Sequence, residues 1–563
     1  MTNKFFLITI LALTLIIFLN SCRTESPVLK SIDPRIGVMG EFITLTGSGF
    51  GGSRDDSSYV MIAGIPPTNS SYHLWQDNLI IVRVPELGES GLVYVHTRGK
   101  KSNGLLFTNS ASVPRPVDGE VFGLEPRIIS VNPQSGTPGS IITITGNNFG
   151  VSRENTLQAV SGVFFSWDFD SPSFNQFNIS DPEFIEVSEM ELGYEFWSSR
   201  EIRVRLPDGA VSGSLEVRTP HGRSRPVYFD VSGRPGTKVL KDKRIYTISY
   251  SVDIRINEAT RPNTLYLWIP RPINSPSQRN TRLISRNNEP FLENHRGVSL
   301  FKLESLLTGS NHSINNSFRV EVYAVETNLN PQFIRQETSP LSVMYTQNTA
   351  LIPSETREIR TTVNSIIGRE QNPYVKTKAI YDWIITNIQI IDTQPSLTDL
   401  GEVLDQKQAD SYTAVLLFTA MTRAAGVPCL PIAGVLIDQM GHTIRHYWAE
   451  FWIDSFGWVP VDPVMGTGAL AGFIQQLNTA GFDWLGDIEQ PEIDTANYYF
   501  GNIDNQRIAF SRGDLQLSQM ENRGRIVSHN RSYSLQNIWE EAAGGLESYT
   551  SLWGDIIISG LYH

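Results

Sequence analysis

The sequence predicts a multidomain protein: two all-β sandwiches, a further β-rich domain and an α+β domain. Three observations support this fold class. The chain has 563 residues, which is too long for a single hydrophobic core. Its first part contains an internal repeat in which apolar and polar residues alternate, as they do in strands. After about residue 355 the apolar period becomes helical and then alternates again.

The repeat covers Pro27–Gly51 and Pro126–Gly150, which superpose when one is shifted by 99 residues. The shift matches Pro34 with Pro133, Gly37 with Gly136, Gly40 with Gly139, Thr44 with Thr143, Gly47 with Gly146 and Phe50 with Phe149. Each copy continues with a tryptophan and an apolar strand, then an alternating strand before a glycine turn. Period-2 segments bounded by Gly, Pro and Asn predict small antiparallel sandwiches.

This pattern resembles the IPT/TIG immunoglobulin-like module. The resemblance places one domain at residues 23–110 and a second at 111–232, the second with an acidic insertion at about 151–195. In the family such modules are spacers or binding modules. We expect the pair to form a stalk, and we expect Trp75 and Trp197 to be core residues rather than contact residues.

The N-terminus predicts export. Lys4 precedes an apolar run, Phe5–Leu19, which is too short to be a spanning helix and is typical of a secretory signal. The ending Leu19-Asn20-Ser21-Cys22 resembles the lipobox of bacterial lipoproteins. The resemblance implies that residues 1–22 contain the signal, that Cys22 is acylated, and that the protein is anchored to a bacterial membrane in the cell envelope, periplasmic or surface-exposed. A plain signal peptide or an uncleaved anchor are the alternatives.

Composition excludes one class of partner and predicts no cofactor. Lys and Arg total 46 against 58 Asp and Glu, a net charge of −12, and no basic run is present, so we expect no nucleic-acid partner. No His/Cys/Asp spacing suggests a metal site, and no glycine-rich loop suggests bound phosphate. The other cysteine is Cys429, so the mature protein is expected to lack internal disulfides.

The second half begins with a β-rich domain, predicted at 240–350. Two helices follow, one ending at Gly368 and one starting at Asn372-Pro373. A third helix is predicted from Ser411 to Ala425, because apolar residues recur at helical spacing before Gly426. Further on, we expect a strand pair around Asp504-Asn505 and a helix with a Gly-Gly break over residues 534–553.

Two alternating runs, HYWAEFWI and GWVPVDP, flank the turn Asp454–Gly457 and predict a hairpin. Pairing about Ser455–Phe456 would place His446 nearly opposite Asp462. Side chains directly opposite each other on neighbouring strands lie about 5 Å apart. Local geometry alone therefore predicts an imidazole beside a carboxylate.

The order R-A-A-G-V-P, H-x-W-x-E and G-W-V-P-V-D-P resembles the transglutaminase-like superfamily, which has a papain-like fold. The motifs cover about residues 355–465, and the domain is expected to span 351–563 with its C-terminal extension. In the family a cysteine at the start of the core helix attacks an amide carbonyl. Counting back from G-V-P places that cysteine at Ser411. The resemblance makes His446 the general base and acid, and Asp462 the group that orients it.

Serine changes the chemistry. A helix N-terminus stabilises a thiolate, whereas a hydroxyl needs a base in contact at the moment of attack. Ala409 and Tyr447 stand where the family has a glycine and a small residue, and Asp410 adds a negative charge. Ser411 is therefore interpreted either as a non-catalytic N-cap or as a nucleophile, and His446–Asp462 either as a structural pair or as a catalytic one.

The neighbouring residues of interest are expected to be structural. Cys429 follows Gly-Val-Pro at the start of an apolar strand, where a buried inert thiol is expected rather than a relocated nucleophile. Trp448, Trp452 and Trp458 lie on the hairpin, where core packing is the default, although they could also wall a cleft.

Three functions follow from these patterns. The first is a lipid-anchored binding or scaffolding protein, a pseudoenzyme whose transglutaminase-like cleft holds peptide or protein segments. The second is a serine-dependent amide hydrolase or acyl-transferase acting on peptide or protein carboxamides. The third is a surface adhesin that binds through the IPT/TIG domains.

Overall fold

The structure is a computed structural model that describes residues 26–55, 57–68, 71–85, 90–109, 124–153, 155–156, 159–168, 183–188, 191–335, 340–391, 399–438, 440–470, 494–529 and 531–562. Cys22 and the rest of the predicted signal lie outside these residues, as does part of the acidic insertion. The chain divides into two compact units, Met1–Val121 and Phe122–His563. Each unit has hydrophobic clusters of its own.

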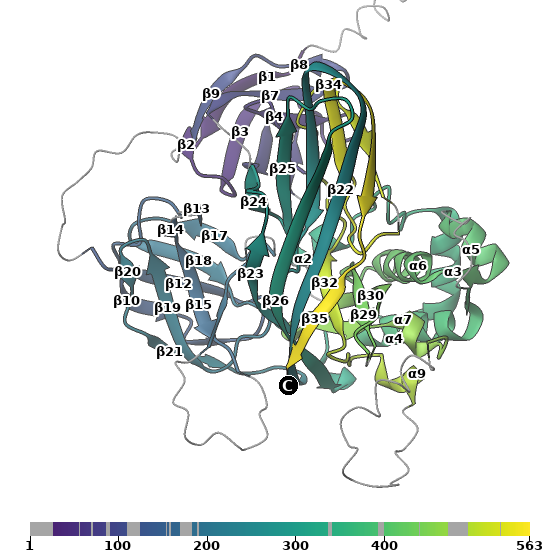
Figure 1. Ribbon diagram of the computed structural model, residues 1–563. Helices are drawn as coiled ribbons and strands as arrows, with labels where there is room; N and C mark the ends of the chain where they lie inside the picture. The colour runs from purple at the N-terminus through teal and green to yellow at the C-terminus, as the bar shows by residue number, and fades with distance from the viewer. Residues whose placement is uncertain are drawn as a thin grey trace, which may run out of the picture. The chain divides into compact units, whose positions relative to one another are not determined.

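The first unit is a two-sheet sandwich, as the repeat predicts (Figure 1). Its sheets have the orders β1-β3-β6-β5 and β2-β9-β7-β4, with β8 paired to β7. The strands are β1 Val28–Asp33, β2 Ile36–Gly37, β3 Phe42–Ser48, β4 Tyr59–Ile62, β5 Tyr72–Gln76, β6 Leu79–Arg83, β7 Gly91–Thr97, β8 Lys100–Lys101 and β9 Leu105–Asn109. Alternate residues of the strands fill the core between the sheets.

The second sandwich opens the second unit and repeats the first. Its sheets have the orders β10-β12-β18-β17 and β11-β21-β19-β15-β16, with β20 paired to β19. The strands are β10 Arg127–Asn132, β11 Ser135–Gly136, β12 Ile141–Asn147, β15 Gly162–Ser166, β16 Phe184–Glu186, β17 Tyr194–Trp197, β18 Glu201–Arg205, β19 Gly213–Thr219, β20 Gly222–Arg223 and β21 Val227–Val231. In the insertion, β13 (Asn155–Thr156) pairs with β14 (Ala159–Val160).

The repeated residues have equivalent roles in the two sandwiches. Trp75 donates its indole N–H to the carbonyl of Phe50 at 3.0 Å, and Trp197 donates to Phe149 at the same distance. A Cβ on the repeated glycine Gly47 would lie 2.1 Å from a backbone oxygen, and the same holds at Gly146. The tryptophans are half-buried and fix the loop after the central strand, which agrees with a structural role.

The β-rich domain is built on one long strand, β22 (Gly236–Pro270), which pairs with four others. Its further strands are β23 Gln278–Arg286, β24 Leu292–His295, β25 Val298–Glu304, β26 Asn311–Leu329, β33 Arg525–Val527, β34 Glu540–Trp553 and β35 Ile557–Tyr562. Figure 1 shows the yellow C-terminal strands β34 and β35 beside the teal β22. The end of the chain therefore completes the sheet of this domain.

The helix predicted over residues 534–553 is wrong, because most of that segment is strand β34. Gly544 and Gly545 explain the difference. A Cβ on Gly544 would lie 2.4 Å from the carbonyl oxygen of Pro262, and one on Gly545 would lie 2.3 Å from that of Thr260. The two glycines let β34 lie close against β22, and this tertiary pairing outweighs local helix propensity. The strand pair expected around Asp504-Asn505 is also wrong: only its second half forms a strand, and that strand pairs elsewhere.

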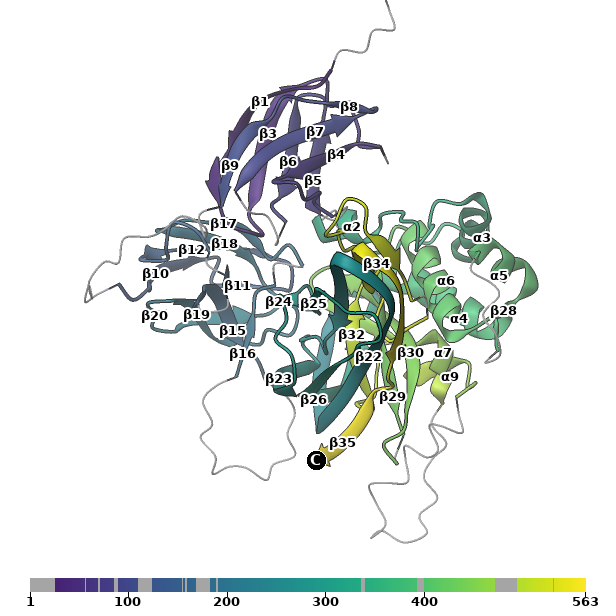
Figure 2. The same ribbon diagram turned by 45° about the horizontal axis from the view of Figure 1, so that its top comes forward.

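The α+β domain packs its helices against one face of a four-stranded sheet (Figure 2). The sheet order is β31-β30-β29-β32. The strands are β29 Cys429–Ile437, β30 Thr443–Ile453, β31 Gly457–Val461 and β32 Arg507–Arg512, with a small parallel pair β27 Gln389–Ile390 and β28 Gln408–Ala409. The helices are η3 Pro331–Phe333, α2 Pro340–Tyr345, α3 Arg357–Ile367, α4 Pro373–Asn387, α5 Leu400–Gln406, α6 Ser411–Ala424, α7 Pro463–Gly466 and α9 Thr495–Tyr498.

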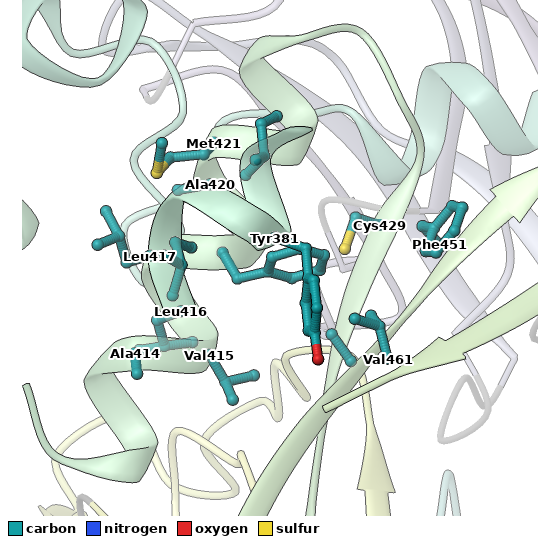
Figure 3. Packing of buried hydrophobic residues seen from close by; sticks show 14 of the residues in the cluster. Tyr381, Ala414, Val415, Leu416, Leu417, Ala420, Met421, Cys429, Phe451 and Val461 are labelled. Atoms are coloured by element: carbon teal, nitrogen blue, oxygen red, sulfur yellow. The ribbon is translucent and has the colours of Figure 1, made fainter. Parts of the chain in front are cut away.

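The helix ends follow from the sequence. Gly368 terminates α3 with a positive φ, and the Asn372 side chain caps α4 by accepting from the backbone of Tyr374 and Val375. Helix α6 is buried along almost its whole length. Its apolar side chains belong to one buried cluster with Tyr381, Cys429, Phe451 and Val461 (Figure 3).

The opposite face of this sheet packs against the second sandwich. Trp448, Trp452 and Trp458 share a buried cluster with Trp167 of that sandwich and Tyr323 of the β-rich domain. The rings of Trp167 and Tyr323 meet edge to face at 5.1 Å. The second sandwich is thus packed into the body of this unit.

Candidate active site

Ser411 is the first residue of α6, and its neighbour Asp410 is the N-cap. Asp410 has extended backbone, and its Oδ1 accepts from the amide of Thr413 at 2.7 Å. The interpretation of Ser411 as the N-cap is therefore wrong by one residue, because the adjacent aspartate is an equally good cap. Ser411 is half-buried at the positive end of the helix dipole.

His446 and Asp462 are joined, as the hairpin predicts. Strand β30 pairs with β31 about Ser455, with Ala449 opposite Val461. His446 Nε2 and Asp462 Oδ2 are 2.6 Å apart, and both residues have no exposed surface. The Nδ1 atom of His446 is buried and has no hydrogen-bond partner in the described part of the chain.

Two further charged residues, Arg507 and Asp504, complete the cluster around Asp462. Arg507 Nη1 donates to Asp462 Oδ2 at 2.9 Å, the same oxygen that His446 contacts. The other side of the guanidinium binds Asp504. Sequence reasoning missed Arg507, because it lies 45 residues beyond Asp462 and reaches it only through the pairing of β32 with β29.

Both carboxylates of the cluster, those of Asp462 and Asp504, have charged hydrogen-bonding partners that lower their pKa. Burial alone would raise the pKa of Asp462, but the charge and hydrogen bond of His446 and the charge of Arg507 hold it below its ordinary value. Burial would also raise the pKa of Asp504, but the charge and hydrogen bond of the Arg507 guanidinium outweigh it and hold the pKa below its ordinary value. The two carboxylates and the one guanidinium of this cluster sum to a charge of −1 without His446.

Ser411 and His446 lie on adjoining elements but are not joined by a hydrogen bond within the residues that the structure describes. The residue after each of them makes the contact instead. Tyr412 and Tyr447 pack edge to face with ring centroids 5.2 Å apart. The structure thus brings together two of the three predicted residues, His446 and Asp462, and leaves Ser411 unconnected to them.

Comparison with known protein families agrees with this architecture. Residues 360–463 match the model of the transglutaminase-like superfamily, and residues 27–109 and 126–231 match that of the IPT/TIG domain. The chain carries two IPT/TIG domains and a transglutaminase-like domain. The IPT/TIG matches coincide with the two sandwiches, and the transglutaminase-like match begins in α3 and ends just after Asp462.

Individual relatives are distant. An uncharacterized protein of Haemophilus influenzae is 22% identical over 314 residues, which cover 48% of this chain and 79% of that protein. A solved structure from Cytophaga hutchinsonii, titled "Putative Cysteine Protease", is 13% identical and covers 58% of this chain and 92% of its own, with a TM-score of 0.37. The periplasmic domain of TgpA from Pseudomonas aeruginosa is 13% identical, with coverages of 40% and 92% and a TM-score of 0.25.

A short segment from the C-terminal region lies against the start of α6 in the transglutaminase-like domain. Arg531 Nε donates to Asp410 Oδ2 at 2.5 Å, and its guanidinium lies 5.3 Å from the centre of the Tyr412 ring. Tyr447 donates its hydroxyl to the carbonyl of Ser532 at 2.7 Å. The negative charge expected beside Ser411 is therefore paired, and the bulky Tyr447 is fixed in place.

The remaining candidates in the transglutaminase-like domain are structural. Cys429 is a free, fully buried thiol, and burial raises its pKa to about 12, so it carries no thiolate near neutral pH. Trp448, Trp452 and Trp458 are each less than 5% exposed and pack in one buried cluster. Trp448 also lines a small cavity beside Asp504 and Arg507. Among the described residues no group of three or more His, Cys, Asp or Glu side chains could hold a metal ion.

Proposed function

We propose that this protein is an exported, lipid-anchored binding or scaffolding protein whose transglutaminase-like domain holds peptide or protein segments without cleaving them. One observation carries the proposal: the Ser411 hydroxyl makes no hydrogen bond to His446, whose open nitrogen Nδ1 is buried. A serine hydroxyl attacks only when a base in contact takes its proton. Displacements of about 1 Å between reacting groups can cost two orders of magnitude in rate.

A bulky side chain at the start of α6 tests whether peptides bind there. The full-length protein, purified in detergent, is screened on a peptide array, and Ser411→Trp is compared with Ser365→Trp. Ser365 is an exposed residue of α3 and is the matched control. We expect Ser411→Trp to lose most of the peptide signal and Ser365→Trp to keep it. If both variants keep the peptide signal, peptides bind elsewhere on the protein. If neither variant nor wild type gives a signal, the proposed peptide binding is wrong.

The proposed membrane anchor rests on the lipobox-like sequence ending at Cys22. No helix among the described residues is long and apolar enough to cross a membrane. Because the proposed anchor consists of acyl chains on Cys22, Cys22→Ser should move the protein from the membrane fraction to the soluble envelope fraction and abolish palmitate labelling. Cys429→Ser, which alters the buried thiol, should leave both unchanged. Membrane retention of Cys22→Ser would contradict the proposal.

A serine-dependent amide hydrolase or acyl-transferase is the second candidate, and the His446–Asp462 bond favours it. Because Asp462 accepts from Nε2–H, the neutral imidazole presents Nδ1 as its proton acceptor. In that reaction the Ser411 oxygen bonds to the amide carbon while its proton passes to Nδ1. The proton then moves to the leaving amine as the C–N bond breaks, and water or another amine releases the acyl group.

A further inference from the structure

The segment Arg531–Tyr533, called the strap below, contacts both sides of the candidate site. It lies 121 residues beyond Asp410 in the chain, yet Arg531 pairs with Asp410 and covers the Tyr412 ring. The carbonyl of Ser532 accepts from Tyr447, the residue after His446. The residues before and after Ser411, and the residue after His446, are thus all engaged by this one strap.

The strap is held in a conformation that its sequence does not favour. Arg531 has φ of +58°, and the left-handed region is unfavourable for a long side chain with a Cβ. The tertiary contacts of the strap must outweigh this strain. Tyr533 anchors its far end by packing against Phe510, with ring centroids 4.9 Å apart. The strap is thus fixed at Tyr533 and has its unfavourable backbone conformation at the other end, at Arg531.

We infer that the strap is a built-in pseudo-ligand: it occupies the peptide site at the start of α6, and a peptide carrying an arginine displaces it. This deepens the proposed binding function and rests on it. The incoming guanidinium takes the place of Arg531 on Asp410 and Tyr412, and a backbone carbonyl of the peptide takes the place of that of Ser532 on Tyr447.

The chemistry of the contacts selects the ligand. The Asp410 side chain is 21% exposed, so a neutral ligand that removed Arg531 would leave a partly buried carboxylate without its charged partner. Arginine meets both requirements of the site, because its planar guanidinium pairs with a carboxylate while lying over an aromatic ring. Lysine supplies the charge as a compact ammonium and loses the planar contact.

Anisotropy of a fluorescein-labelled peptide, Gly-Gly-Arg-Ser-Gly-Gly, tests this on the full-length protein in detergent. A second peptide carries citrulline, the neutral isostere, in place of arginine. Arg531→Ala should bind the arginine peptide about tenfold more tightly than wild type, because a competing occupant that fills the site nine times in ten lowers apparent affinity by that factor. Arg525→Ala, which alters an exposed arginine of β33, is the control and should behave as wild type.

Two further variants keep the test decisive if Arg531→Ala folds poorly. Arg531→Gln keeps a long polar side chain but removes the ion pair of the strap with Asp410, so it should also strengthen binding. Asp410→Asn keeps the helix cap and should abolish the preference for arginine over citrulline. Suppose that wild type binds array peptides while neither strap variant binds the arginine peptide more tightly than wild type does. That result would overturn the proposal that the strap occupies the peptide site, but not the proposed binding function. If neither wild type nor any variant binds a peptide, both the strap proposal and the proposed binding function are wrong.

Discussion

Asp462 is the residue on which the buried cluster depends, since it accepts from His446, from Arg507 and from the backbone of Met465. Asp462→Asn removes the charge and leaves Arg507 with one carboxylate fewer in the interior. Breaking a buried pair by removing one partner typically costs about 3–5 kcal/mol. Urea unfolding should show a loss of that size. Asp382→Asn, which alters a partly exposed pair with Lys378, should cost less than about 0.5 kcal/mol.

The same residues predict how stability depends on pH. The folded pKa of Asp462 and Asp504 lies below the ordinary 3.8, so the unfolded chain binds more protons at acid pH. Their contribution to the free energy of unfolding is fully present above about pH 4 and is lost as the pH falls through the folded values. The folded pKa of Glu540 is also lowered, so Glu540 likewise loses its contribution to stability as the pH falls. Burial raises the folded pKa of Glu541, so the effect of Glu541 on stability has the opposite pH dependence.

Thermal unfolding measured between about pH 7 and pH 3 checks this sign. The midpoint should fall steeply below about pH 4, and Asp504→Asn should be less stable at neutral pH with a shallower acid slope. An acid slope identical in wild type and Asp504→Asn would show that the cluster does not control acid stability.

Local sequence was enough to predict His446 beside Asp462, because both lie on one hairpin and strand pairing fixes their neighbourhood. It was not enough for Arg507 or Arg531, which reach the site from other parts of the chain through tertiary pairing. It also placed the helix cap one residue late, because Asp410 and Ser411 are both good caps and only the backbone conformation distinguishes them.

At the scale of elements, strand β29 connects the site to the rest of the sheet. Gly434 pairs with His446 on one side and Ala509 on the other, and a Cβ there would lie 1.9 Å from the carbonyl oxygen of Ile508. Gly434→Ala should force β32 away and cost about 1–3 kcal/mol. Gly52→Ala, at a position with open space, is the control. Equal unfolding midpoints for the two variants would contradict the packing described for β29 and β32.

The helices and the hairpin were predictable because their apolar period and end residues agree, as Gly368 and Asn372 illustrate. Strand β34 was not, because its alanines and glutamates favour a helix locally. Only the close approach of β22 at Gly544 and Gly545 explains why that segment is extended.

At the scale of the whole molecule, a buried ion pair joins the second IPT/TIG domain to the rest of its unit. Lys238 Nζ donates to both oxygens of Asp208 at 2.7 and 2.8 Å and to the carbonyl of Trp458 at 2.6 Å. Gly457 makes room for this contact, since a Cβ there would lie 2.2 Å from Asp208 Oδ1. The second IPT/TIG domain and the transglutaminase-like domain should therefore unfold as one body.

Lys238→Met tests this cooperativity. It leaves the Asp208 carboxylate buried without its cation, which should cost about 3–5 kcal/mol. Hydrogen exchange should then show β12 and β18 of the second IPT/TIG domain opening before β29, whereas all three open together in wild type. Lys241→Met, on the same strand but in a partly exposed pair with Glu326, should exchange as wild type does. Unchanged exchange in Lys238→Met would contradict the coupling.

Amide turnover by residues 23–563 tests most directly whether the transglutaminase-like domain binds peptides without cleaving them, as we propose. Peptide hydrolysis and amine incorporation into glutamine peptides are measured for wild type, Ser411→Ala and Ser411→Cys, with the Cys variant showing whether the site still accepts an amide. We expect no turnover by wild type or by the Ala variant. Turnover by wild type that Ser411→Ala abolishes would make Ser411 a nucleophile and contradict the proposal.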